Sequence, residues 1–225
     1  MFGLPKATEY GRRAPKERFY KHLALTPKIK DAFVDQIKNI IWANKLAPAT
    51  INISKGPRVE EIQVFIINLK TQTFNEGILK VLDSQIPYFI VYVLCLDDKC
   101  KLYVGYKEGL KSDHFSVKEY FSSEWLNRED IALEIKGLNL DEVYENFIKQ
   151  IGKEKLIVHA DDGDVGSAVE RTRQIEKLEA EAAKLEKKQY TEVQPKRKYE
   201  IHERVLKIKE QLEELRNGKA EDAHK

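Results

Sequence analysis

The chain has 225 residues, of which 42% are hydrophobic and 34% are charged, and its formal net charge is +2. This hydrophobic content suits a folded protein with one core and an appendage. The longest apolar run, residues 86–96, is too short to span a bilayer, so we expect no membrane segment. The first ten residues lack the apolar segment of a secretion signal, and we expect a cytoplasmic protein.

The N-terminal part of the chain is its most basic part. Pro5, Gly11 and Pro15 interrupt any regular period, so residues 1–21 are predicted to form an arm rather than a helix or strand. Aromatic residues alternate with the basic ones, a combination that contacts phosphate and stacks on bases. The candidate nucleic-acid-binding residues are Lys6, Arg12, Arg13, Lys16 and Arg18. Alternatively, their stems lie along the core.

The core is predicted to centre on residues 62–106. Two runs, 62–69 and 87–96, are apolar on both faces, which is typical of strands covered on both sides of a sheet. Between them, residues 75–86 show helical spacing with Asn75 in position to cap the helix. Strand, helix and strand predict a βαβ unit with parallel strands.

The remaining elements of the core are weaker predictions. Thr26 and Pro27 predict a helix that continues to about residue 44, and residues 49–54 alternate as a short strand would. Further strands are expected at residues 99–106, 114–121 and 131–135, followed by a helix over residues 139–151. The fold class is therefore α+β, a mixed sheet with flanking helices over residues 22–155.

Two cysteines lie on either side of an expected hairpin turn at Asp97 and Asp98. Cys95 and Cys100 would face each other on adjacent strands, where a disulfide could form. Without an export signal we expect both to be reduced and to act as small apolar side chains.

The C-terminal part is predicted to be a helical hairpin over residues 165–217, after an acidic linker at 156–166 and before a frayed tail at 218–225. Ser167 and Glu170 form a capping box at its start. Apolar residues recur at heptad spacing on both helices, either to pair within the chain or to meet a partner chain. The candidate partner-binding residues are Ile175, Leu178, Leu185, Val205, Ile208 and Leu212.

One catalytic alternative deserves a test. Restriction-type nuclease cores carry an acidic residue and an acid-x-Lys motif that hold a divalent metal ion. Glu61 and Lys70 stand at comparable places, but Asn68 replaces the second carboxylate. We therefore expect no catalytic residues, no metal and no cofactor. The acidic segment 160–167 does not match the calcium-loop pattern and is predicted to be a solvated linker.

Several stretches together resemble the bacterial domain-of-unknown-function family 4391. They are residues 3–20 (GLPKATEYGRRAPKERFY), 45–56 (KLAPATINISKG), 62–70, 86–94 and 137–151, together with the Lys/Glu-rich helical tail. The resemblance covers about residues 3–216. It implies a setting beside helicases and DNA methyltransferases in restriction or phage-defence clusters, but no catalytic residues.

The function expected from these observations is that of a non-catalytic accessory subunit of a DNA-modification or defence assembly. The hairpin would bind a protein partner, a helicase or methyltransferase by family setting, and the arm would contact DNA. The alternatives are a metal-dependent nuclease or its inactive relative, and a structural protein that self-assembles through the heptads.

Overall fold

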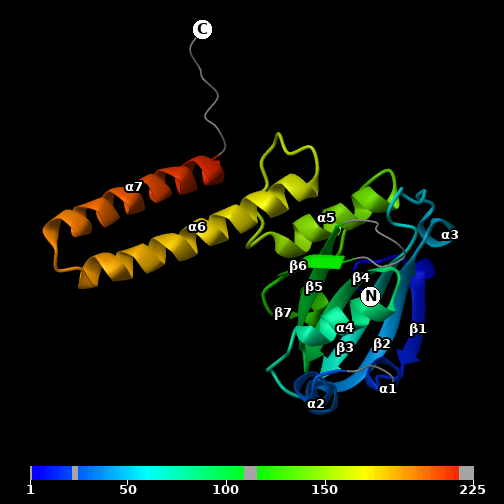
Figure 1. Ribbon diagram of the computed structural model, residues 1–225. Helices are drawn as coiled ribbons and strands as arrows, with labels where there is room; N and C mark the ends of the chain where they lie inside the picture. The colour runs from blue at the N-terminus through cyan, green and yellow to red at the C-terminus, as the bar shows by residue number, and fades with distance from the viewer. Residues whose placement is uncertain (1, 22–24, 109–115, 218–225) are drawn as a thin grey trace, which may run out of the picture. The chain divides into compact units, whose positions relative to one another are not determined.

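The computed structural model describes residues 2–21, 25–108 and 116–217. It divides the chain into two units, Met1–Glu154 and Lys155–Lys225. The first unit is built on one mixed sheet with the strand order β1-β2-β3-β4-β5-β6, and β7 pairs with β5 (Figure 1). Its strands are β1 (Glu9–Ala14), β2 (Ile37–Leu46), β3 (Ile62–Leu69), β4 (Phe89–Leu96), β5 (Lys99–Glu108), β6 (Ser116–Ser122) and β7 (Leu126–Asn127).

Helices cover both faces of this sheet. They are α1 (Glu17–Tyr20), α2 (Pro27–Asp35), α3 (Pro48–Ile51), α4 (Gly77–Gln85) and α5 (Leu140–Gly152), with short 3-10 helices at Lys6–Thr8 and Arg128–Asp130. On one face, Phe33 of α2 and Leu79 of α4 pack in one cluster with Phe65 and Tyr92 of the sheet. On the other face, the ring of Tyr144 in α5 meets Phe89 edge-on, with ring centroids 4.7 Å apart.

The predicted βαβ unit is confirmed. β3 and β4 are parallel, are joined through α4 and are buried along most of their length. Asn75 accepts a hydrogen bond from the backbone N–H of Gly77 at 2.9 Å, so it closes the turn that opens α4. Asn139 likewise caps α5 by accepting from Glu142 N–H at 3.1 Å.

The prediction that residues 1–21 form an arm without a helix or strand is wrong, because Glu9–Ala14 pair antiparallel with β2. Gly11 has a φ of +64°, and the pairing register shifts between Glu9 and Arg12. A left-handed glycine inside a bulge disturbs the alternation by which an edge strand is recognised. The basic segment is therefore part of the sheet.

The prediction of one helix from residue 26 to about 44 is also wrong, because α2 ends at Asp35 and Ile37–Leu46 form β2. β2 lies between β1 and β3, so hydrogen bonding on both sides overrides the helical spacing of its isoleucines. Lysine side chains close the end of α2. Lys16 Nζ donates to the carbonyl of Phe33 at 3.1 Å, and Lys70 Nζ donates to that of Val34 at 2.8 Å.

Three smaller predictions need correction. The strand expected at residues 49–54 is instead α3, where Pro48 suits the first helical position and Thr50 Oγ1 accepts from Ala47 N–H at 2.9 Å. Residues 131–135 form no strand, although Leu133 N–H donates to the carbonyl of Phe2 at 2.9 Å. The strand expected at 114–121 is β6, and residues 114 and 115 lie outside the described residues.

The expectation of reduced cysteines is wrong in this structure, which joins Cys95 and Cys100 in a disulfide. The two residues are paired across β4 and β5, with their Cα atoms 4.2 Å apart. Both side chains are buried. The bond therefore ties the two strands together next to their tight turn.

The second unit is a helical hairpin of α6 (Val165–Thr191) and α7 (Pro195–Asn217), which lie side by side (Figure 1). The predicted capping residue is wrong, since Asp164 rather than Ser167 caps α6 by accepting from Ser167 N–H at 3.0 Å. Ile175, Ala182, Ile208 and Leu212 form a buried seam with Leu178 and Leu185 packed against it. Heptad spacing thus serves pairing within the chain.

Candidate nucleic-acid interface

A cleft in the first unit gathers three arginines and two aromatic residues of the N-terminal segment. Its volume is about 500 Å³, within the range of small-molecule sites. β1 and α1 supply the basic side, while β2, β3 and the segment between α4 and β4 supply the apolar side. The lining residues that matter below are Tyr10, Arg12, Arg13, Arg18, Phe19, Trp42, Gln63, Phe65 and Tyr88. We call this site the arginine cleft.

A row of aromatic rings crosses from the edge strand toward the centre of the sheet. The centroids of Tyr10 and Trp42 lie 4.2 Å apart, and those of Trp42 and Phe65 lie 5.9 Å apart in a stacked arrangement. The guanidinium of Arg12 lies over the Tyr10 ring at 4.7 Å. Trp42 is fixed further because its Nε1–H donates to the carbonyl of Asn44 at 3.1 Å. Fixed aromatic faces beside guanidinium groups are what single-stranded nucleic-acid sites use.

The charge of the arginine cleft is positive and uncompensated. Arg12, Arg13 and Arg18 are exposed, and no Asp or Glu lines the cleft. Within the described residues, none of the three arginines forms an ion pair. Guanidinium groups left open to solvent in a concave site attract anions, phosphate above all.

A chain of polar side chains holds Gln63, which lines the cleft. Lys45 Nζ and Glu61 Oε2 are 2.5 Å apart, and Gln63 Nε2 donates to Glu61 Oε1 at 2.8 Å. The hydrogen bond to Glu61 raises the pKa of Lys45. An ionised carboxylate only accepts hydrogen bonds, so it fixes which end of the Gln63 amide faces it. The other end of the Gln63 amide, the carbonyl oxygen Oε1, makes no hydrogen bond to Glu61.

Buried side chains also hold Tyr88 in place. Lys107 Nζ donates to the carbonyl of Tyr88 at 2.8 Å and pairs with Asp83 Oδ1, also at 2.8 Å. The hydroxyl of Tyr120 donates to the other oxygen of Asp83, and burial raises the pKa of Tyr120. Asp83 and Lys107 are almost fully buried, so their charges compensate each other inside the core. This cluster anchors α4 to the sheet and supports the wall of the cleft.

The five predicted nucleic-acid-binding residues therefore divide by location. Arg12, Arg13 and Arg18 line the arginine cleft. Lys16 does not, because its ammonium group donates to the carbonyls of Phe33 and Ile37. Lys6 is exposed in the 3-10 helix before β1, and the cleft does not include it.

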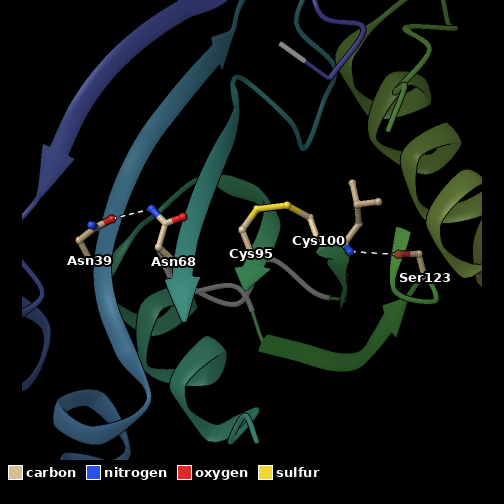
Figure 2. Close-up of a disulfide and its surroundings, with 6 residues drawn as sticks. Asn39, Asn68, Cys95, Cys100 and Ser123 are labelled. Carbon is tan, nitrogen blue, oxygen red and sulfur yellow. Dashed lines mark hydrogen bonds between the residues drawn. A yellow bond between two sulfur atoms is a disulfide. The ribbon is translucent and has the colours of Figure 1, made fainter. Parts of the chain in front are cut away.

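The structure does not bring together the two residues of the nuclease alternative. Glu61 precedes β3 and Lys70 follows it, so at a strand rise of about 3.3 Å per residue they stand about 30 Å apart. Glu61 pairs with Lys45, whereas Lys70 caps α2. Asn68, at the expected acidic position, donates to Asn39 Oδ1 at 2.7 Å, beside the disulfide (Figure 2). Among the described residues, no three His, Cys, Asp or Glu side chains gather as metal ligands.

Comparison with known proteins places the chain in a family. The profile of a domain of unknown function, DUF4391, matches residues 2–212. The chain belongs to this family. The match spans both units, so the sheet and the hairpin are both parts of the DUF4391 sequence. No curated protein and no solved structure matches the chain.

In the hairpin of this DUF4391 chain, the turn between the helices is exposed to solvent, whereas the apolar seam is buried. All six predicted partner-binding residues lie along the seam, packed within the chain, so a partner does not meet them first. At the turn, however, Tyr190, Val193 and Tyr199 are 89%, 90% and 64% exposed. Lys196, Arg197 and Lys198 lie beside them in the first turn of α7, where positive charge opposes the helix dipole. We call Tyr190, Val193, Lys196, Arg197, Lys198 and Tyr199 together the hairpin tip.

No helix in the described part of the chain is long and apolar enough to cross a membrane.

Proposed function

We propose that this chain is a non-catalytic accessory subunit that binds DNA through the arginine cleft and a protein partner through the hairpin tip. The proposal rests on one observation. Three arginines that form no ion pair within the described residues line the same cleft as a row of aromatic rings. Phosphate contacts from such arginines supply affinity, and the rings supply surface for bases. The family resemblance suggests a DNA-modification or defence assembly as the setting.

The DNA-binding part is tested by charge reversal in the cleft. Arg12→Glu with Arg13→Glu should weaken binding to a fluorescent single-stranded oligonucleotide at least tenfold at low salt, because it removes two phosphate contacts and adds repulsion. Lys28→Glu with Lys30→Glu is the matched control, since it makes the same charge change on exposed positions of α2. Equal weakening by both pairs would show a general charge effect and refute the cleft.

The docking part rests on charge and exposure at the hairpin tip. Exposed tyrosines next to lysine and arginine fit an acidic surface with an apolar centre, as interface hot spots do. Tyr190→Ser with Tyr199→Ser should abolish co-purification with a helicase or methyltransferase partner of the kind that the family resemblance implies. Leu206→Ser, an exposed apolar residue of α7 away from the turn, should leave co-purification unchanged. If the tyrosine variant still co-purifies with the partner, the hairpin tip is not part of the interface.

A further inference from the structure

The floor of the arginine cleft offers a hydrogen-bond acceptor without a partner. The side chain of Gln63 lines the cleft although the residue is only 2% exposed. Its amide nitrogen is held by Glu61, and within the described residues its Oε1 accepts no hydrogen bond. Oε1 is open to the cleft rather than sealed in the core, so a ligand bound in the cleft can donate a hydrogen bond to it.

The surroundings of this acceptor fit a flat, partly polar ring. Phe65 lies two residues after Gln63 on β3, Trp42 lies on the neighbouring strand β2, and Tyr88 lies just before β4; all three line the same cleft. A nucleobase has an apolar face that stacks on such rings and an N–H edge that donates to a carbonyl oxygen. The arginines on β1 and α1 then lie on the side where the attached phosphates would be.

We propose that the arginine cleft binds one unpaired nucleobase, stacked beside Trp42 and hydrogen-bonded to Gln63 Oε1, with its flanking phosphates on Arg12, Arg13 and Arg18. This inference rests on the proposed function and adds that the ligand is single-stranded. In a duplex the base faces are covered by their neighbours, so the aromatic rings and Gln63 would gain nothing. The shared chemistry, a base with its phosphate, belongs to a DNA strand or to a free nucleotide.

The first test uses Trp42 as its own reporter. The chain has two tryptophans, so Trp125→Phe leaves Trp42 as the only one. In this background, short single-stranded oligodeoxyadenylate should quench the fluorescence, whereas an oligonucleotide of the same length made of abasic sites should not. The same strand annealed to its complement should bind at least tenfold more weakly, because stacking on aromatic side chains is lost. Equal binding of single strand and duplex would overturn the inference and leave phosphate binding standing.

The second test concerns Gln63 itself. Gln63→Leu should weaken binding of oligodeoxyadenylate about five- to tenfold and leave binding of the abasic strand unchanged, since only the base loses a partner. Gln63→Met, of similar length, should do the same and guards against misfolding of the first variant. Gln72→Leu, an exposed residue in the loop after β3, is the matched control. If the Gln63 variants weaken abasic and normal strands equally, the hydrogen bond to a base is refuted.

Titration with deoxyadenosine monophosphate distinguishes the two candidate ligands, a DNA strand and a free nucleotide. A strand offers several phosphates to the three arginines, so it should bind at least tenfold more tightly than the mononucleotide. Equal affinity, with quenching of Trp42, would keep the base site but refute the DNA-binding function. Failure of every oligonucleotide and of the mononucleotide to bind would refute both proposals together.

Discussion

Neighbouring basic residues of the N-terminal segment have different roles because their side chains have different partners. Arg12 and Arg13 are open to solvent, whereas Lys16 is committed to backbone carbonyls at the end of α2. Burial lowers the pKa of Lys16, and the positive charge of Lys70 lowers it further. We therefore expect Lys16 to stabilise the fold rather than to contact DNA.

Lys16→Met should consequently lower the free energy of unfolding by about 2 kcal/mol, the cost of losing hydrogen bonds from a charged donor. Its affinity for DNA and the salt dependence of that affinity should not change. Denaturant unfolding and a binding titration of the same variant provide the two readouts. A stable variant with weakened DNA binding would mean that Lys16 contacts phosphate.

The buried pair of Asp83 and Lys107 predicts a non-additive response. Lys107→Met should destabilise the protein by about 3 kcal/mol or more, because Asp83 then remains buried without a positive partner. Adding Asp83→Leu should recover part of that loss, since no charge is left in the core. Thermal or denaturant unfolding of both single variants and the double variant measures the coupling. Simple addition of the two losses would contradict the pairing.

Acid should weaken the second unit through Asp162. Hydrogen bonding to Arg171 lowers the pKa of Asp162 to about 2. A lowered folded-state pKa means that its stabilisation is complete above about pH 4, where the unfolded carboxylate is also ionised, and is lost as pH falls toward 2. With solvent screening this amounts to about 1 kcal/mol. Asp162→Asn should therefore unfold more easily than the wild type at pH 7, and the difference should shrink as the pH falls through about 2 and vanish below it.

At the scale of elements, the sequence predicted best those parts whose periodicity is local. The strands and helix of the βαβ unit, α5 and the two hairpin helices each follow from a periodic pattern within one continuous segment. β1 and β2 were missed because their pairing depends on residues far along the chain, and because Gly11 interrupts the first pattern. Misassignment of β2 as a helix also concealed the place of Trp42.

The candidate site was predictable to a similar extent. Its arginines stand out by composition, and Arg12, Arg13 and Arg18 do line the cleft. Gln63 gives no local signal, since one glutamine in an apolar strand is unremarkable until its neighbours in space are known. In the sequence alone, the one indication that Gln63 belongs to a site is that it is a polar residue inside the apolar run 62–69.

The hairpin should unfold on its own when its seam is charged. Leu178→Asp with Ile208→Asp places carboxylates in the apolar seam, where burial of charge is costly. Helical circular dichroism should fall, while the thermal transition of the sheet unit persists, because the two units have separate cores. Leu206→Asp, on an exposed position of α7, should leave both signals unchanged. Loss of the whole fold in the double variant would mean that the two cores depend on each other.

At the scale of the whole molecule, the two units have different proposed contacts. The sheet unit carries the arginine cleft, and the hairpin unit carries an exposed tip. The proposed accessory role needs both, since DNA binding alone would not bring a partner and docking alone would not need the arginines. Variants of the cleft should thus leave co-purification of the partner intact, and variants of the tip should leave DNA binding intact.

The most direct test is the salt dependence of binding to single-stranded DNA. Three phosphate contacts predict a slope of about −2 for the logarithm of the association constant against that of salt concentration. Arg12→Glu with Arg13→Glu should bring the slope to about −0.7 or closer to zero, because only Arg18 remains, while Lys28→Glu with Lys30→Glu should keep it near −2. A wild-type slope near zero, or an unchanged slope in the arginine variant, would contradict DNA binding at this cleft.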